Sequence, residues 1–135
     1  MTDSFLNPLK ARLAGERPCL GAWLLSGAPI AAEAMASLGF HWLCVDMEHG
    51  SADISQVEAI FAAAERHGAT GMARIGSLDG HLARRLLDLG AQGIIVASEF
   101  DHARVDADLP ARERKGIGRL VLNQHDLPVL RETTI

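Results

Sequence analysis

Two acids and a histidine follow directly after a short apolar run in the first half of the chain. The run covers residues 42–45, and the polar residues are Asp46, Glu48 and His49. Residues two apart in a strand share a face, so the two carboxylates point the same way and the histidine follows on the turn. Three ionisable side chains, the kind that carries acid–base chemistry, therefore converge where this strand ends. We predict a functional site at this point.

The surrounding pattern predicts the fold that positions this site. A strand that is apolar throughout, such as 42–45, is typical of a parallel sheet covered by helices on both faces. Three predicted helices end at Gly39, Gly68 and Gly90, each a few residues before a strand. Alternating units of this kind imply parallel strands with right-handed crossovers, and such folds carry their chemistry at the carboxyl ends of the strands. The expected fold class is therefore α/β.

The predicted elements fill the chain up to residue 97. Four strands are expected, over residues 19–25, 42–45, 70–75 and 93–97. Asn7 caps the first helix, with Pro8 at its first helical position. Ser55 and Glu58 are expected to form a capping box for the third helix, and Asp79 to cap the fourth.

Apolar stripes at helical spacing indicate which face of each helix is buried. The predicted stripes are Ile30, Ala34, Met35 and Leu38 in the second helix, Val57, Ile60, Phe61 and Ala64 in the third, and Leu82, Leu86 and Leu89 in the fourth. Beyond residue 97 the pattern fades into a weak helix over 98–109 and a charged connector. From Gly116 the sequence supports no assignment. We therefore interpret 1–135 as one domain, which the family resemblance given below makes a partial one with a divergent C-terminal segment, 98–135.

Composition excludes several classes of partner. The chain carries a formal charge of −4, and 48% of its residues are apolar and 22% charged. The negative charge argues against a nucleic acid or an anionic membrane. The chain does not open with a basic segment followed by an apolar one, and no apolar run approaches about 18 residues, so we expect a cytoplasmic protein. Cys19 and Cys44 fall in or beside predicted strands, where we expect free thiols.

Five segments occur in an order that is more specific than any one of them. They are Leu20–Leu24, Ala36–Leu43, Val45–His49, Ala73–Arg74 and Leu86–Gly93. In this series the chain resembles the HpcH/HpaI aldolase / citrate lyase family. The resemblance implies a class II aldolase, a lyase dependent on a divalent metal such as Mg²⁺ or Mn²⁺, on a (β/α)₈ TIM-type barrel. Such an enzyme forms the enolate of pyruvate and adds it to an aldehyde, or runs the reverse cleavage.

The resemblance also assigns roles to single residues. His49 falls on the family's general base, Arg74 on the arginine that stabilises the transition state, and Asp88 on the acid that raises the basicity of the histidine. A carboxylate bonded to an imidazole favours the protonated ring, and an arginine neutralises charge that appears only as the enolate forms. Asp46 and Glu48 fall where the family places supporting acids near the metal and its waters.

The same resemblance limits what this chain is expected to do alone. A typical (β/α)₈ barrel needs about 250 residues, so the chain of 135 residues corresponds to the first half. The family's direct metal-binding carboxylates lie in the second half, so no metal ligand is assigned in this chain and weak metal binding is expected. Because four parallel strands without closure leave open edges, we expect a homo-oligomer or a pairing with a complementary barrel half.

Each assignment has a purely structural alternative. His49 can be an ordinary loop histidine, and Arg74 a solvated arginine at a strand end. Asp88 falls in the last turn of a helix, where an acid opposes the macrodipole, and its alternative is a surface pair with Arg84 or Arg85. Two functions remain open. One is a lyase completed by a second chain, and the other is a non-catalytic remnant that binds small oxoacids or a partner.

Overall fold

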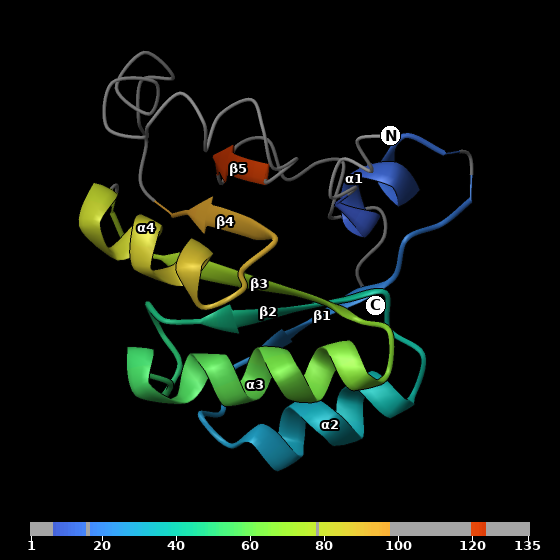
Figure 1. The fold of residues 1–135 in the computed structure, drawn as a ribbon, viewed down its shortest axis with the longest axis horizontal. Helices are drawn as coiled ribbons and strands as arrows, with labels where there is room; N and C mark the ends of the chain where they lie inside the picture. The colour runs from blue at the N-terminus through green and yellow to red at the C-terminus, as the bar shows by residue number, and fades with distance from the viewer. Residues whose placement is uncertain (1–6, 16, 78, 98–119, 124–135) are drawn as a thin grey trace.

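The computed structural model describes residues 7–15, 17–77, 79–97 and 120–123, the last range for its backbone alone. The elements are α1 (Pro8–Leu13), β1 (Gly21–Leu24), α2 (Pro29–Ser37), β2 (Trp42–Asp46), α3 (Ile54–Arg66), β3 (Thr70–Ile75), α4 (Gly80–Asp88), β4 (Gly93–Val96) and β5 (Leu120–Asn123). The strands form one parallel sheet in sequential order, β1-β2-β3-β4-β5 (Figure 1), so their carboxyl ends share one edge. The predicted α/β class, with the sequential strand order of a (β/α) barrel, is confirmed.

One strand was missing from the prediction. β5 lies inside the segment 98–135 and pairs in parallel with β4. Its four residues form a run too short for periodicity to distinguish a strand from a buried helical segment, so the pattern alone did not identify it. The weak helix predicted over 98–109 lies outside the described residues.

Three of the helix starts test the capping predictions. Asn7 caps α1, where its side chain accepts hydrogen bonds from the amides of Leu9 and Lys10, and Asp79 caps α4, both as predicted. The capping box of α3 was placed wrongly, because Asp53 and Gln56 form it two residues earlier. The Asp53 carboxylate accepts from the Ser55 amide at 2.8 Å, and the Asp53 amide donates to the Gln56 side chain at 2.9 Å.

The predicted buried face of α2 was also wrong. Its buried residues are Ala32 and Ala36, whereas Ile30 and Leu38 are 72% and 78% exposed. This helix has a single charged residue, Glu33, so its polarity says little about which face turns inward. α2 packs mainly on α3, and its small side chains allow the two helices to lie close together. Glu33 of α2 pairs with Arg66 of α3 at 3.4 Å. None of the helices in the described ranges is long and apolar enough to cross a membrane.

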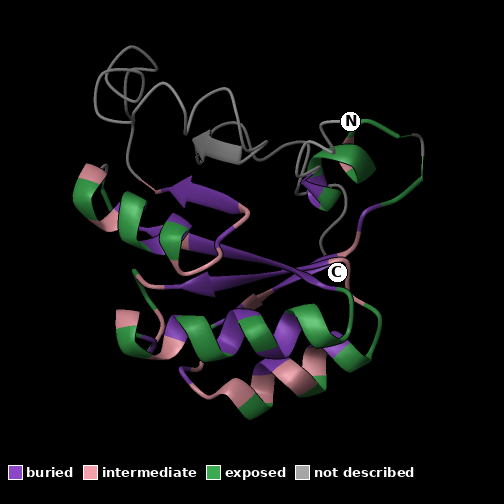
Figure 2. Ribbon diagram, in the orientation of Figure 1, coloured by how far each residue is buried: buried purple, intermediate pink, exposed green. Residues whose placement is uncertain are grey.

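The sheet separates two buried clusters, and Figure 2 shows strands β1–β4 as almost continuously buried. The outer cluster lies between the sheet and α2, α3 and α4, and it contains Leu43 and Val45 of β2. The inner cluster lies on the opposite face under α1 and contains Trp42 and Cys44. Successive residues of a strand alternate between faces, so Asp46 continues the inner row. Cys19 and Cys44 are buried free thiols, as predicted, and desolvation raises the pKa of Cys44 well above its usual value.

Gly21 makes room for the largest side chain of the inner cluster. A Cβ atom added at Gly21 would lie 1.7 Å from Cε2 of Trp42, whose ring is fully buried. The ring therefore occupies the space that a side chain on β1 would fill. Neither the β1 backbone nor a fully buried indole can move away cheaply, because protein interiors are close-packed.

We expect Gly21→Ala to lower the free energy of unfolding by about 3 kcal/mol, at the upper end of overpacking costs. Chemical denaturation measures this. Gly76→Ala is the matched control, since an added Cβ there has no neighbour nearer than 3.4 Å. Equal stabilities of the two variants would contradict the close packing of Trp42 against the β1 backbone.

Candidate functional site

The candidate site lies where β2 and β3 end. Asp46 is the last residue of β2, and Arg74 lies directly opposite it in the β2–β3 register. Both belong to the inner row of their strands, above Cys44 and Met72. The carboxyl ends of neighbouring parallel strands thus bring together two residues that are 28 positions apart in the sequence.

Asp46 and Arg74 form a two-point ion pair. The Arg74 Nε donates to Oδ1 of Asp46 at 3.0 Å, and the Arg74 Nη2 donates to Oδ2 in a short contact. Asp46 is almost fully buried, with 1% of its surface exposed, whereas the Arg74 side chain retains 21%. A bidentate pair of this kind fixes the plane of the guanidinium group.

The same carboxylate also shapes the turn that carries the other two polar residues. Oδ1 of Asp46 accepts hydrogen bonds from the backbone amides of Glu48 and His49, both at 3.0 Å. An aspartate that bonds amides two and three residues ahead holds a turn in one conformation. The carboxylate of Asp46 therefore positions two residues. It binds the guanidinium group of Arg74 and the backbone amide of His49.

These contacts determine the ionisation of the pair. Burial alone raises the pKa of Asp46, but the hydrogen bonds from Arg74 and from the two backbone amides outweigh it, and the net pKa lies below the usual 3.8. The hydrogen bond with Asp46 raises the pKa of Arg74, against the opposing effect of burial. Both groups are therefore charged at neutral pH.

Gly50 closes the turn against the loop that follows β1. A Cβ atom there would lie 2.2 Å from the backbone oxygen of Asp46 and 2.8 Å from that of Leu25. The neighbouring amide of Ser51 donates to the same Leu25 oxygen at 2.8 Å. A glycine directly after the polar triplet is the sequence signal for this close approach, and it was overlooked in predicting the site.

Glu48 lies between the histidine and the arginine. Its Oε2 atom is 3.6 Å from Nε2 of His49 and 3.6 Å from Nε of Arg74. The side chain of His49 is 69% exposed and that of Glu48 26%. An imidazole that faces solvent beside a carboxylate is accessible to a small molecule and can exchange protons with it.

The structure does not bring Asp88 to this group. Asp88 is the exposed last residue of α4, which runs antiparallel to the strands and ends before β4 begins. It therefore lies toward the amino ends of the strands, whereas His49 follows the carboxyl end of β2 (Figure 1). The predicted alternation of strands and helices already implied this separation, because a helix that connects two parallel strands ends at the amino edge of the sheet. The two side chains do not meet within one chain.

The residues at the site do not provide a metal-binding set. Within the described ranges, no group of three or more His, Cys, Asp or Glu side chains could hold a metal ion. Both oxygens of Asp46 are already engaged by Arg74, which leaves Glu48 and His49 as the donors nearby. Divalent cations such as Mg²⁺ require several oxygen ligands in fixed geometry, so these two donors alone do not satisfy them.

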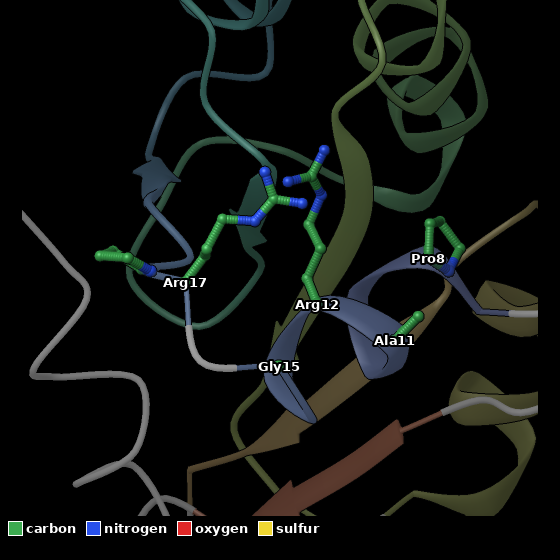
Figure 3. A pocket seen from close by; sticks show the side chains of 6 residues that line it. Pro8, Ala11, Arg12, Gly15 and Arg17 are labelled. Carbon is green, nitrogen blue, oxygen red and sulfur yellow. The ribbon is translucent and has the colours of Figure 1, made fainter.

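A pocket of about 360 Å³ lies elsewhere in the molecule. Figure 3 shows it beside α1 and the loop to β1, lined by Pro8, Ala11, Arg12, Gly15, Arg17 and Pro18. None of the predicted site residues contributes to it. The site at the strand ends is therefore not part of this pocket.

Comparisons with known proteins agree with this architecture. The chain is 42% identical over 97 residues to a hydroxypyruvate/pyruvate aldolase of Paraburkholderia phytofirmans, a match that covers 69% of this chain and 36% of that enzyme. A crystal structure of an HpcH/HpaI aldolase/citrate lyase family protein from Burkholderia cenocepacia superposes with a TM-score of 0.69 and 30% identity, covering 82% of this chain and 46% of that one. A citrate synthase superposes with a TM-score of 0.71 over 94% of this chain and half of that protein, and at 23% identity it supports the fold alone. No protein-family model matches the sequence.

Fold and site together define a (β/α)-barrel type domain with ionisable residues at the carboxyl ends of its strands. The chain belongs to the HpcH/HpaI aldolase/citrate lyase family, as its sequence relatives and structural neighbours show. It spans about a third of the length of the aldolases that it matches in sequence, and about half of the structural neighbours.

Proposed function

We propose that this chain supplies the enolate-forming residues of a pyruvate aldolase whose site is completed by a complementary barrel half. The observation that carries the proposal is the geometry around Asp46, whose buried carboxylate binds Arg74 and also holds the turn that presents His49 to solvent. Aldolases named for pyruvate and related oxoacids recur among the sequence relatives, which supports this reaction class.

His49 is the proposed general base. Its imidazole removes a proton from the methyl carbon of pyruvate, and the electrons of that C–H bond move to form the enolate, whose negative charge develops on the carbonyl oxygen. In the reverse direction the protonated ring returns the proton. Base assistance of this kind contributes about 10²–10⁴-fold to a rate.

Arg74 is the proposed stabiliser of the enolate oxygen. A guanidinium carries five N–H donors, and Asp46 accepts from two of its nitrogens, so donors remain for a substrate oxygen. Because Arg74 is already held in place, no reorganisation is needed as charge develops on the oxygen. Glu48 lies close enough to both residues to balance their charge.

The divalent metal implied by the resemblance is proposed to take its direct ligands from the complementary half. Such an ion polarises the carbonyl of an oxoacid. The described residues lack a donor set for it, so enolate formation would need the complementary half, although the contacts that hold Arg74 and the His49 turn are already present. The cytoplasmic location expected from the sequence stays a prediction.

The role that the resemblance assigns to Asp88 requires a second copy of the chain. Because Asp88 lies toward the opposite edge of the sheet from His49, the aspartate of one copy would have to act on the histidine of another. This proposal fits the expected homo-oligomer. In the presence of the complementary half, mixing an inactive His49→Ala chain with an inactive Asp88→Ala chain would then restore activity at mixed interfaces.

Aldol cleavage tests the proposed function. The chain is mixed with the C-terminal half of a homologous aldolase, Mn²⁺ and a 4-hydroxy-2-oxoacid, and release of pyruvate is followed with lactate dehydrogenase. We expect release above the sum of the separate halves. A complex that forms, as shown by light scattering, but releases no pyruvate would favour the non-catalytic remnant, the alternative that the missing metal ligands suggest.

A further inference from the structure

Trp23 contacts Arg74 although their strands are not neighbours. The guanidinium carbon of Arg74 lies 4.8 Å from the centroid of the Trp23 ring. Trp23 belongs to β1 and Arg74 to β3, with β2 between them. Adjacent strands lie about 4.8 Å apart, so the indole ring must extend across β2 to make this contact.

The inner face of β2 leaves space for that crossing. Cys44 pairs with Trp23 in the β1–β2 register, on the same face of the sheet, and its side chain is small. Trp42, one layer below, meets the Trp23 ring edge-on at 89° with 6.4 Å between ring centroids. Because Trp42 is fully buried, it provides a rigid support on which the Trp23 ring rests.

We propose that Trp23 is a positioning residue for Arg74. Asp46 holds one edge of the guanidinium group, and the central carbon of that group lies over the Trp23 ring. An ion pair along a single edge still permits the group to tilt about that edge, whereas a second contact, between the central carbon and the indole ring, opposes the tilt. A contact between an arginine and an indole face shifts the equilibrium between the contacting and the free arginine by about 2- to 30-fold.

The consequence for function rests on the proposed function. With one edge held by Asp46 and its central carbon against the Trp23 ring, Arg74 directs its remaining donors at one position, where the enolate oxygen would form. The substitution Trp23→Leu should then lower kcat by about 2- to 30-fold and change KM little, because the alignment of Arg74 matters most once charge has developed.

The contact itself is tested by NMR on the arginine-labelled chain, without any need for activity. The Nε–Hε signal of Arg74 is assigned by its loss in Arg74→Lys. In Trp23→Leu we expect this signal to change chemical shift, because the ring current is removed, and its exchange with water to rise by about 2- to 30-fold. Trp23→Phe should restore most of the protection, and Leu25→Ala, at an exposed neighbouring side chain, should have no effect.

The same NMR signal distinguishes positioning of Arg74 by Trp23 from positioning by Asp46 alone. An unchanged Arg74 signal in Trp23→Leu, together with a changed one in Asp46→Asn, would overturn the proposal and leave Asp46 as the residue that holds Arg74. If Trp23→Leu does not fold, the same Arg74 signal is measured in Trp23→Met. The flexible methionine side chain fills the space but offers no aromatic face. Inactivity of the wild-type chain in a stable complex with its complementary half would contradict the proposed function and leave the NMR result intact.

Discussion

Replacing His49 with alanine is expected to lower the rate at which the completed enzyme exchanges the methyl protons of pyruvate for deuterium by about 10²–10⁴-fold. The side chain is 69% exposed, so its removal leaves no buried cavity. The turn should also persist, because Asp46 binds the backbone amide at this position and not the ring. Exchange is followed by the loss of the methyl proton signal of pyruvate.

The matched control is His67→Ala. His67 is another partly exposed histidine, paired with Glu33 at 3.4 Å beyond the end of α3, so it lies toward the amino edge of the sheet. We expect its replacement to leave exchange unchanged. If both variants kept the wild-type rate, His49 would be an ordinary loop histidine and the base would have to be sought elsewhere.

Replacing Asp46 with asparagine is expected to lower the free energy of unfolding by about 2–4 kcal/mol near neutral pH, because a buried pair loses one charge and Arg74 loses its partner. Asp46 is almost fully buried and also holds the turn before Gly50. Urea denaturation measures the change. Glu58→Gln, which removes an acid from the exposed face of α3, is the matched control and should have little effect.

The pH dependence of this difference follows from the sign of the pKa shift. The pKa of Asp46 is lower in the folded chain than its usual 3.8, so its charge stabilises the fold above that value. The stabilisation is lost as pH falls through the folded pKa. The difference in free energy of unfolding between wild type and Asp46→Asn should therefore be constant near neutral pH and become smaller in strong acid. A difference in free energy of unfolding of about 1 kcal/mol or less at neutral pH would show that Asp46 and Arg74 form an ordinary surface ion pair.

Much of the fold could be predicted because helix ends and strand starts carry local signals. Gly39, Gly68 and Gly90 each have positive φ, which is why a glycine marks the end of α2, α3 and α4. The buried face of α2 could not be predicted, because an alanine-rich helix packed on another helix buries its small residues and leaves Ile30 and Leu38 outside. Rotation of such a helix is set by tertiary packing.

The site was predicted less completely than the fold. The strand ends placed Asp46 and Glu48 beside His49, and the structure brings Arg74 to them through the β2–β3 register. No local pattern indicated that Asp46 would hold Arg74, since that pairing depends on strand order. For the same reason the contact with Trp23, two strands away, was not foreseen.

Deuterium exchange into pyruvate by the wild-type chain, with and without its complementary half, tests the central claim most directly. The claim is that His49 and Arg74 form the enolate but depend on a metal bound elsewhere. With Mn²⁺ present, we predict exchange near the solvent background for the chain alone, and His49-dependent exchange when the complementary half is added. Rapid His49-dependent exchange by the chain alone would contradict the incomplete site, and no exchange by a stable complex would contradict the aldolase.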